Sequence, residues 1–417
     1  MTTPAALPDV LYLWWLGSPQ EPKLIGTLRW VRRALHHHAG VSLRYAPAWL
    51  ADGFALSEDM PLHAVDYLPL SPDVAAGAVD DARPDRWGER VIRFLIKPQR
   101  LSTLDYLYFA GDNRVGALGV SESADVYVPH HHGVLPELAD VQQMHDVIRQ
   151  VEANEPLEPS VLRLVTPGAT LGGAKPKALL QMDGIEWVLK FAEKGDVLDV
   201  GLIEHASMTL AAKAGIDVCE THALPYLQTG QIKHAVAVRR FDREGGHRLH
   251  CISAHVGLRA AGADYGYPEM ALLMRRLGES SGLAYVGEQF FRRMVFNICI
   301  DNTDDHEKNH MFIGQEYRLK LAPAFDVLPT LQSLGVQSIR VGKTGADSNL
   351  SNALSEHKLF GLSLVRARQL AQEVVAVVNE WQAHFILAGV ALHDVQTVAQ
   401  HVDRAFLFKQ RQELMSI

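Results

Sequence analysis

The feature that most constrains this chain is a polar cluster, NTDDHEKNHMFI at residues 302–313, followed by LAPAFDVLPT at residues 321–330. Asp304 and Asn309 lie five positions apart, and Asp326 follows 17 positions later, behind an apolar residue. Phosphoryl transfer needs a carboxylate near the acceptor hydroxyl, together with an amide oxygen and a second carboxylate that hold magnesium. The D-x4-N spacing followed by an apolar residue and Asp matches that need. The pattern therefore predicts a phosphoryl-transfer centre, against the alternative of a solvated turn with chance spacing.

A second feature lies upstream, where a loop rich in Gly and Pro, TPGATLGGAKPK at residues 166–177, precedes a hairpin signal. Asp183 and Gly184 separate two strand-like runs, which is a strong sign of a two-residue hairpin turn. Lys190 is the one charged residue in the second run, WVLKFA. This position suits a phosphate-binding lysine on a strand, or an edge-strand lysine whose ammonium reaches solvent. The loop fits neither G-x-G-x-x-G nor the Walker pattern, because an alanine follows Gly173.

The order of these features along the chain favours the first interpretation. The run EHASMTLAAK at residues 204–213 is rich in helix formers, and Glu204 at its start could pair with Lys190. The alternative for Glu204 is a carboxylate on a helix surface. Glycine-rich loop, strand lysine, helix glutamate, catalytic segment and metal-binding aspartate occur here in the order found in protein kinases.

Changes in pattern divide the chain into three parts. Residues 1–155 alternate short apolar runs with turn signals, residues 156–255 carry the loop and hairpins, and residues 256–417 are mainly helical. A strand-rich part followed by a helical part predicts an α+β fold of the bilobal protein-kinase type. Its β-rich upper lobe and helical lower lobe would follow an N-terminal β-rich subdomain.

Local patterns predict individual elements within these parts. Strands are expected at LYLWWLG, LIGTLRW, VSLRYA, residues 161–165, 178–182 and 185–191, and in a hairpin of residues 236–243 with 248–252. Helices are expected over residues 86–97, 204–213, 288–300 and 362–387, the last capped by Ser363.

Composition restricts the class of protein. The formal net charge of -8 makes nucleic-acid binding by this chain alone a poor match. Cys219, Cys251 and Cys299 form no CxxC pair, which suits a reducing cytosol. The histidine runs 36–38 and 130–132 are expected on the surface. The N-terminal apolar run is short and follows no basic residue, and no apolar stretch approaches the roughly 20 residues of a bilayer span, so we expect a soluble cytoplasmic protein.

Five blocks of the sequence, TLGGAKPK, WVLKF, RRFDR, TDDHEKN and AFDVLPT, together resemble the HipA family, the toxin kinases of bacterial HipBA toxin–antitoxin modules. RVGAL at residues 114–118 is similar to that family's N-terminal domain. The resemblance implies a serine/threonine protein kinase that uses ATP and Mg²⁺. It also implies a protein substrate such as an aminoacyl-tRNA synthetase, and a separate helix-turn-helix antitoxin that would bind DNA.

The resemblance also implies a role for each matching position. Asp304 would be the catalytic base, and Asn309 and Asp326 would bind magnesium. Thr170 falls where the family carries a self-phosphorylated serine that switches the kinase off. The positions that would contact ATP are Gly172, Gly173, Ala174, Lys175, Pro176, Lys177, Lys190, Arg239, Arg240, Phe241, His306, Lys308, Asn309 and Asp326.

Three positions depart from the family pattern. Thr170 stands in place of the serine. Arg239 stands where the family carries an acidic residue at the hinge between the lobes. Asp305 replaces a small residue beside the catalytic aspartate, and we expect it to add negative charge near the phosphates and to alter the demand for magnesium.

Three other functions are compatible with parts of the sequence. A kinase-like fold without activity would serve as a binding or regulatory module, and ATP turnover separates it from an active kinase. His306 and His310, spaced i, i+4 near Asp304, could hold a metal in a hydrolase, although HExxH is absent. A nucleophilic cysteine would be Cys251, which has histidines nearby, or Cys299, which lies on an apolar helical face.

Overall fold

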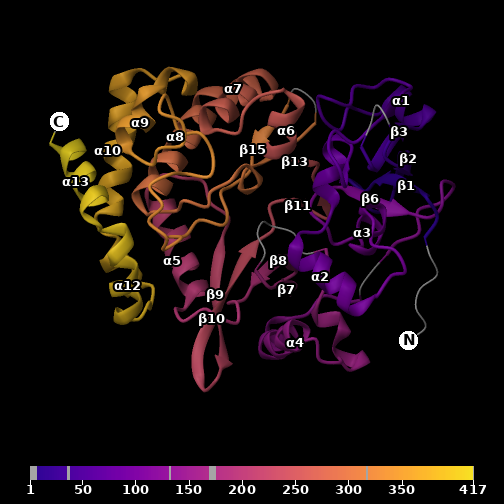
Figure 1. Cartoon of the computed structure of the whole chain (residues 1–417), viewed down its shortest axis with the longest axis horizontal. Coiled ribbons are helices and arrows are strands. Elements are labelled where there is room, and N and C mark those ends of the chain that lie inside the picture. Colours follow the sequence, from indigo (N-terminus) through magenta and orange to yellow (C-terminus); the bar gives the residue numbers. More distant parts are fainter. Residues whose placement is uncertain (1–6, 35–37, 131–132, 169–174, 316–317, 417) are drawn as a thin grey trace. The chain divides into compact units, whose positions relative to one another are not determined.

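The computed structural model describes residues 7–34, 38–130, 133–168, 175–315 and 318–416. The chain folds into two compact units, shown in sequence colours in Figure 1. The first unit comprises residues 1–191, 239–252 and 313–316, and the second comprises residues 192–238, 253–312 and 317–417. The predicted boundaries near residues 155 and 255 divide the chain more finely and stay predictions.

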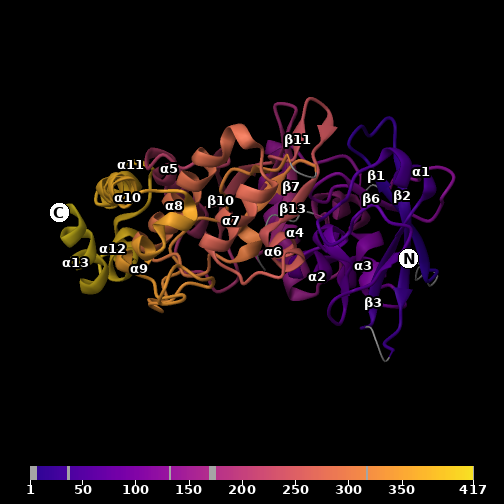
Figure 2. The same cartoon turned by 90° about the horizontal axis from the view of Figure 1, so that it is seen from above.

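The first unit is built on a mainly antiparallel sheet with the strand order β4-β3-β2-β1-β6, in which β5 pairs parallel to β3 (Figure 2). Its strands are β1 (Val10–Trp15), β2 (Lys23–Val31), β3 (Gly40–Tyr45), β4 (Asp66–Tyr67), β5 (Val74–Ala75) and β6 (Leu118–Ser121). Leu11 and Leu13 of β1 are fully buried, as are Ile25 and Leu28 of β2. The three strands predicted at the N-terminus are confirmed, because the alternation of apolar side chains gave each one a face for the core.

Short helices and hairpins complete the first unit. The helices are α1 (Pro47–Asp52), η1 (Gly77–Ala82), α2 (Arg86–Leu95), α3 (Thr103–Phe109), η2 (Leu138–Asp140), α4 (Val141–Ala153) and η3 (Pro159–Leu164). The hairpins are β7 (Lys177–Met182) with β8 (Ile185–Lys190), and β11 (Arg243–Glu244) with β12 (His247–Arg248). Asp183 and Gly184 turn the first hairpin with φ of 51° and 76°, the left-handed values that Asp-Gly supplies.

Two predicted elements of this part of the chain were wrong. Residues 161–165 form no strand, because Pro159 begins the short helix η3 there. The predicted hairpin of residues 236–243 with 248–252 is limited to β11 and β12 around Gly245 and Gly246. Residues 236–238 instead continue β10 and pair with β9.

The second unit is mainly helical. It contains the hairpin β9 (Thr221–Gln228) with β10 (Gln231–Arg239), and the short strands β14 (Met311–Ile313) and β15 (Lys320–Leu321). The strand β13 (Cys251–Ser253) begins in the first unit and ends at the first residue of the next segment of the second. Its helices are α5 (Val200–Lys213), α6 (Ala254–Ala260), α7 (Tyr267–Leu277), η4 (Ser280–Gly282), α8 (Leu283–Cys299), η5 (Glu307–Asn309), α9 (Leu350–Ser355), η6 (His357–Phe360), α10 (Leu364–Val378), α11 (Trp381–Leu387), α12 (Leu392–Val402) and α13 (Ala405–Met415).

Helix α8 forms the centre of this unit, packed against α7 and α10 (Figure 1). Phe291, Met294 and Ile298 are fully buried along it, as the helical spacing predicts. The helix predicted over residues 362–387 starts at its expected cap, Ser363, but is split into α10 and α11. The break occurs where Trp381 turns inward and donates from Nε1 to the carboxylate of Asp403, 3.1 Å away. No helix among the described residues has the length and apolar character of a membrane span.

Candidate active site

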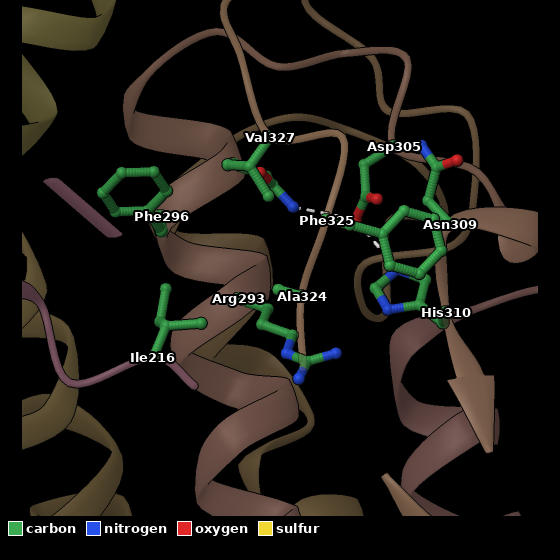
Figure 3. Close-up of a pocket in the computed structure, with 10 residues that line it drawn as sticks. Ile216, Arg293, Phe296, Asp305, Asn309, His310, Ala324, Phe325 and Val327 are labelled. Carbon is green, nitrogen blue, oxygen red and sulfur yellow. Dashed lines mark hydrogen bonds and ion pairs between the residues drawn. The ribbon is translucent and has the colours of Figure 1, made fainter. Parts of the chain in front are cut away.

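Two chain segments are paired within the second unit, and Asn309 precedes one of them while Asp326 follows the other. The backbone N–H of Ala322 donates to the carbonyl of Met311 at 2.9 Å, so the chain before Met311 and the chain after Ala322 run together. A small cavity lies at this end of the pair (Figure 3). Asn309 lines it together with Phe325 and Val327, the residues on either side of Asp326.

The amide of Asn309 is suited to a cation. The residue is 4% exposed, and its Oδ1 accepts no hydrogen bond from any described residue. A buried carbonyl-type oxygen without a donor costs free energy unless another positive group meets it. Asp326 is half-buried and has a left-handed backbone with φ of 61°, which is uncommon outside glycine and often found at functional sites. These two oxygen-bearing side chains fit the ligands that magnesium takes.

Asp304 is exposed, while the residues on both sides of it are held in place. The hydroxyls of Thr303 and Thr330 are 2.6 Å apart, and the Thr330 hydroxyl donates to the carbonyl of Asp301 at 2.9 Å. The hydroxyl of Ser338 donates to the carbonyl of Thr303. These hydrogen bonds hold the backbone next to Asp304, whose side chain is exposed.

Asp305, next to the exposed Asp304, is held in the interior of the second unit by three donors. Its side chain is buried and accepts hydrogen bonds from the Tyr267 hydroxyl, from Asn297 Nδ2 at 2.8 Å and from His310 Nε2 at 3.0 Å (Figure 3 draws Asp305 and His310). Burial alone would raise the pKa of this carboxyl, but His310 and the other donors outweigh it and lower that pKa. Asp305 lines the same small cavity as Asn309, and the expectation that it adds charge near the phosphates and alters the demand for magnesium stays a prediction.

The two histidines of the segment take different partners. His306 Nδ1 accepts from the backbone N–H of Lys308 at 3.3 Å, whereas His310 belongs to the Asp305 cluster. The segment forms only the short helix η5, so the i, i+4 spacing does not place these rings on one helix face. In the described parts of the chain, no three His, Cys, Asp or Glu side chains are grouped to hold a metal ion. Lys308 is exposed.

Lys177 and Lys190 face each other across β7 and β8 in the first unit. Both are buried, at 0% and 2% exposure, and the Lys177 ammonium binds Asp85 Oδ2. Like charges opposite one another destabilise a sheet unless anions offset them. Asp85 offsets the charge of Lys177, and a phosphate contact of Lys190 stays a prediction. Glu204 is buried on α5, and its predicted pairing with Lys190 stays a prediction.

The glycine-rich loop is described only in part. Lys175 is half-buried, and the carbonyl of Pro176 accepts from the backbone of Phe191 at 2.9 Å. The other predicted positions of this loop lie outside the described residues: Thr170, Gly172, Gly173 and Ala174. His36, His37, His131 and His132 also lie outside them.

In the predicted hinge, residues 239–241, one side chain is buried and makes several hydrogen bonds. Arg239 is exposed and Phe241 half-buried, but Arg240 is buried and donates to Asp242 Oδ2 at 2.7 Å. Arg240 also donates to the carbonyls of Asn113 and Arg114, both at 2.8 Å. Its guanidinium is thus occupied within the first unit, and its backbone N–H donates to the Glu186 carbonyl at 3.1 Å.

Asp242 is a residue that reasoning from the sequence missed. It is fully buried and binds Arg240, Arg243 and the backbone N–H of Gly116. Its arginine neighbours in RRFDR were the available signal, because an aspartate between two arginines in an apolar setting is a natural counter-ion.

The cysteines do not resemble nucleophiles. Burial raises the pKa of Cys299 to about 12 and that of Cys251 well above its usual value. Burial also lowers the pKa of His250 to about 4, and its Nε2 lies 2.8 Å from the Leu56 carbonyl. A protonated thiol beside a neutral, hydrogen-bonded imidazole is a poor nucleophile.

Comparison with known proteins places the chain in context. The HipA-like C-terminal domain matches residues 169–382, and the HipA N-terminal domain matches residues 21–121. A curated relative, the putative kinase Y4dM of Sinorhizobium fredii (strain NBRC 101917 / NGR234), is 32% identical over 254 residues, which are 54% of this chain and 59% of that protein. The chain therefore spans less than two thirds of the length of this relative.

Among solved structures, HipA from a Shewanella oneidensis MR-1 complex with HipB and operator DNA aligns over 98% of this chain and 99% of that one. The TM-score is 0.65 at 17% identity, so the likeness shows a common fold and confirms the predicted α+β class. The Helicobacter pylori kinase CtkA aligns over 59% of this chain and 92% of its own at 14% identity. Its TM-score of 0.43 is too low to support an argument.

Proposed function

The chain belongs to the HipA family, and from this premise we propose that it is a protein kinase that moves the γ-phosphoryl group of ATP to a serine or threonine hydroxyl. The observation that carries the proposal is the buried Oδ1 of Asn309, which has no donor among the described residues and lies beside the segment of Asp326. An amide oxygen and a carboxylate beside an exposed aspartate are the set that phosphoryl transfer requires.

In the proposed mechanism, Asp304 accepts the proton of the acceptor hydroxyl. Its exposure leaves the carboxylate open to a protein substrate, and the hydrogen bonds of Thr303 hold the backbone beneath it. Asn309 and Asp326 would hold Mg²⁺, which when bound neutralises negative charge on the phosphates. Positioning and electrostatics supply most of the rate, because the protein forms no covalent bond to the phosphoryl group.

We assign the nucleotide to the positions that match the family. Lys190, Lys175 and Lys177 would contact phosphates together with residues 172–174, as the family resemblance implies. Residues 239–241 would meet the adenine. Arg240 would do so through its backbone carbonyl, because Asp242 occupies its guanidinium and the Glu186 carbonyl accepts from its N–H.

His306 and Lys308 complete the proposed ATP contacts, since both shortly precede the predicted magnesium ligand Asn309 in the same turn. Self-phosphorylation of Thr170 would switch the kinase off, as the family resemblance implies. Mass spectrometry of protein incubated with ATP would detect phosphate on this residue.

We further propose a separate antitoxin partner that binds DNA. The similar HipA of Shewanella oneidensis was solved with HipB and operator DNA. The net charge of -8 leaves this chain poorly suited to bind nucleic acid by itself. The substrate would be a component of translation, such as an aminoacyl-tRNA synthetase, in the cytoplasm.

The test is transfer of labelled phosphate from ATP to protein. We expect Asp304→Ala and Asp326→Ala to abolish transfer without unfolding the chain, because each removes one group of the reacting centre. Glu413→Ala is the matched control, since it removes an exposed carboxylate on α13 and should leave transfer unchanged. Transfer at the wild-type rate in either aspartate variant contradicts the assignment.

Incubation with cell lysate would identify the substrate. Labelled ATP, wild-type protein and the Asp304→Ala variant are compared, and a protein labelled only by the wild type is the substrate. ATP binding without transfer to any protein would instead favour the inactive binding module.

A further inference from the structure

The second unit contains a buried carboxylate that the proposed mechanism does not use. Asp305 accepts hydrogen bonds from three elements: the Tyr267 hydroxyl at the start of α7, Asn297 Nδ2 on α8 at 2.8 Å, and His310 Nε2 after η5 at 3.0 Å. Asn297 and His310 are 3% and 2% exposed. The cluster is therefore a closed set of directional contacts in the interior.

Two members of this cluster are sequence neighbours of residues that have a role in the proposed mechanism. Asp305 follows Asp304, and His310 follows Asn309. His310 has extended backbone, with φ of -116° and ψ of 120°. Asn309 ends the short helix η5, His310 follows it directly, and both side chains line the same small cavity, so a fixed His310 limits where the Asn309 side chain can point. The hydrogen bond between Asp305 and His310 joins the two ends of the turn, next to Asp304 at one end and next to Asn309 at the other.

The cluster also extends to the chain before Asp304. Asn297 Oδ1 accepts from Asn302 Nδ2 at 3.0 Å, and the Asn297 carbonyl accepts from the backbone N–H of Asn302 at 2.9 Å. The same asparagine that donates to Asp305 thus holds the residue two positions before Asp304. The turn is tied to α8 on both sides of its exposed aspartate.

We propose that Asp305 is a positioning residue, which holds the turn of residues 304–310 in the geometry that lets Asn309 bind the metal. This rests on the proposed function, since it assigns Asn309 to magnesium. Asp305 touches neither metal nor nucleotide in this account. Its effect passes through His310 on one side and Asn297 on the other.

The Asp305→Asn variant tests the proposal directly. All three donors meet one carboxylate oxygen, Oδ2, and asparagine keeps the volume but offers only a neutral oxygen in its place, so each of these hydrogen bonds loses its charged acceptor. The probe is Mn²⁺, whose binding in the presence of a non-hydrolysable ATP analogue is followed by electron paramagnetic resonance. We expect Mn²⁺ affinity to fall about tenfold, while the analogue binds metal-free protein as in the wild type.

Variants of the residues that donate to Asp305 should lower the Mn²⁺ affinity by different amounts. Tyr267→Phe removes one hydroxyl and should weaken Mn²⁺ binding about threefold. His310→Ala should match Asp305→Asn, whereas His310→Gln should restore part of the affinity, because its amide nitrogen can donate from a place close to that of Nε2. A purely structural role predicts no such order in metal affinity.

Asp394→Asn is the matched control. Asp394 is a buried carboxylate of the same unit and accepts from the backbone N–H of Asp199 at 3.0 Å, on α12 rather than in the turn. The variant should lower stability without changing Mn²⁺ affinity. If Asp305→Asn fails to fold, Tyr267→Phe carries the test.

The outcomes are distinct. Folded Asp305→Asn, or folded Tyr267→Phe in its place, with wild-type Mn²⁺ affinity would overturn the positioning role and leave the proposed kinase function intact. Wild-type protein that binds neither the analogue nor Mn²⁺ would contradict the proposed function itself, and the positioning role with it.

Discussion

Two buried carboxylates, one in each unit, are held in opposite ways. Asp242 in the first unit meets the charged guanidinium groups of Arg240 and Arg243 and the backbone N–H of Gly116. Asp305 in the second unit meets a hydroxyl, an amide and an imidazole. Both are almost wholly removed from solvent, at 0% and 2% exposure.

The two carboxylates therefore differ in what they stabilise. Asp242 joins two segments that are distant in the sequence, whereas Asp305 fixes the conformation of one turn. Burial alone would raise the pKa of Asp242, but Arg240 and Arg243 lower it far below its usual range. These contacts join residues 240–243 to the RVGAL segment, more than a hundred positions earlier in the chain. Strong charge pairing fixes such a tie, whereas the directional donors around Asp305 fix the angles of one turn.

The largest expected effect comes from breaking the charged cluster. Asp242→Ala leaves Arg240 and Arg243 buried without their shared anion, which should cost about 3–5 kcal/mol of unfolding free energy. Urea unfolding followed by tryptophan fluorescence measures it, because six of the seven tryptophans, all but Trp381, lie in the first unit.

Glu186→Gln is the control for that experiment. Glu186 pairs with Arg240 at 3.1 Å and Arg243 at 3.5 Å, but its side chain is 29% exposed. Its loss should cost about 1 kcal/mol or less. Equal losses for Asp242→Ala and Glu186→Gln would mean that burial does not set the strength of this cluster.

Acid should weaken the first unit through His250. Burial lowers the pKa of this imidazole to about 4, below its unfolded value near 6.5. The unfolded chain therefore binds the proton first as pH falls. The contribution is complete above about pH 6.5 and is lost progressively down to about pH 4, by about 3 kcal/mol. Urea midpoints measured across this range should fall less steeply in His250→Gln than in the wild type.

A smaller loss of stability is expected at the neutral cluster. Asp305→Asn should lower the unfolding free energy by about 1–3 kcal/mol, because the three buried donors on Oδ2 exchange a charged acceptor for a neutral one. Circular dichroism at 222 nm follows the helical second unit during urea unfolding. A loss as large as that of Asp242→Ala would show that the two carboxylates act alike.

The smallest effect concerns the cap of α10. The Ser363 hydroxyl accepts from the backbone N–H of Arg366 at 3.2 Å. Ser363→Ala should cost about 1 kcal/mol, and Ser363→Asp should retain the stability, because aspartate caps equally well. Thermal unfolding of the three proteins under one set of conditions gives the comparison. A loss of stability in both Ser363→Ala and Ser363→Asp would show that the Ser363 hydroxyl does not stabilise α10 as an N-cap.

Local features of the fold followed from the sequence. The turn at Asp183 and Gly184, the N-cap at Ser363 and the alternation along β1 each depend on a few neighbouring residues, and each was predicted. The partner of residues 236–238 and the break near Trp381 were not. Both depend on segments far away in the chain, which compete with the local pattern.

The sequence by itself determined which residues can carry chemistry, because the types and spacing of Asp304, Asn309 and Asp326 already match phosphoryl transfer. It could not determine which of two adjacent aspartates faces solvent. Tyr267 and Asn297 lie 38 and 8 positions from Asp305, and only folding brings their donors to its carboxylate. A buried charge takes the orientation in which donors satisfy it, so the tertiary structure assigned Asp305 to the interior and left Asp304 exposed.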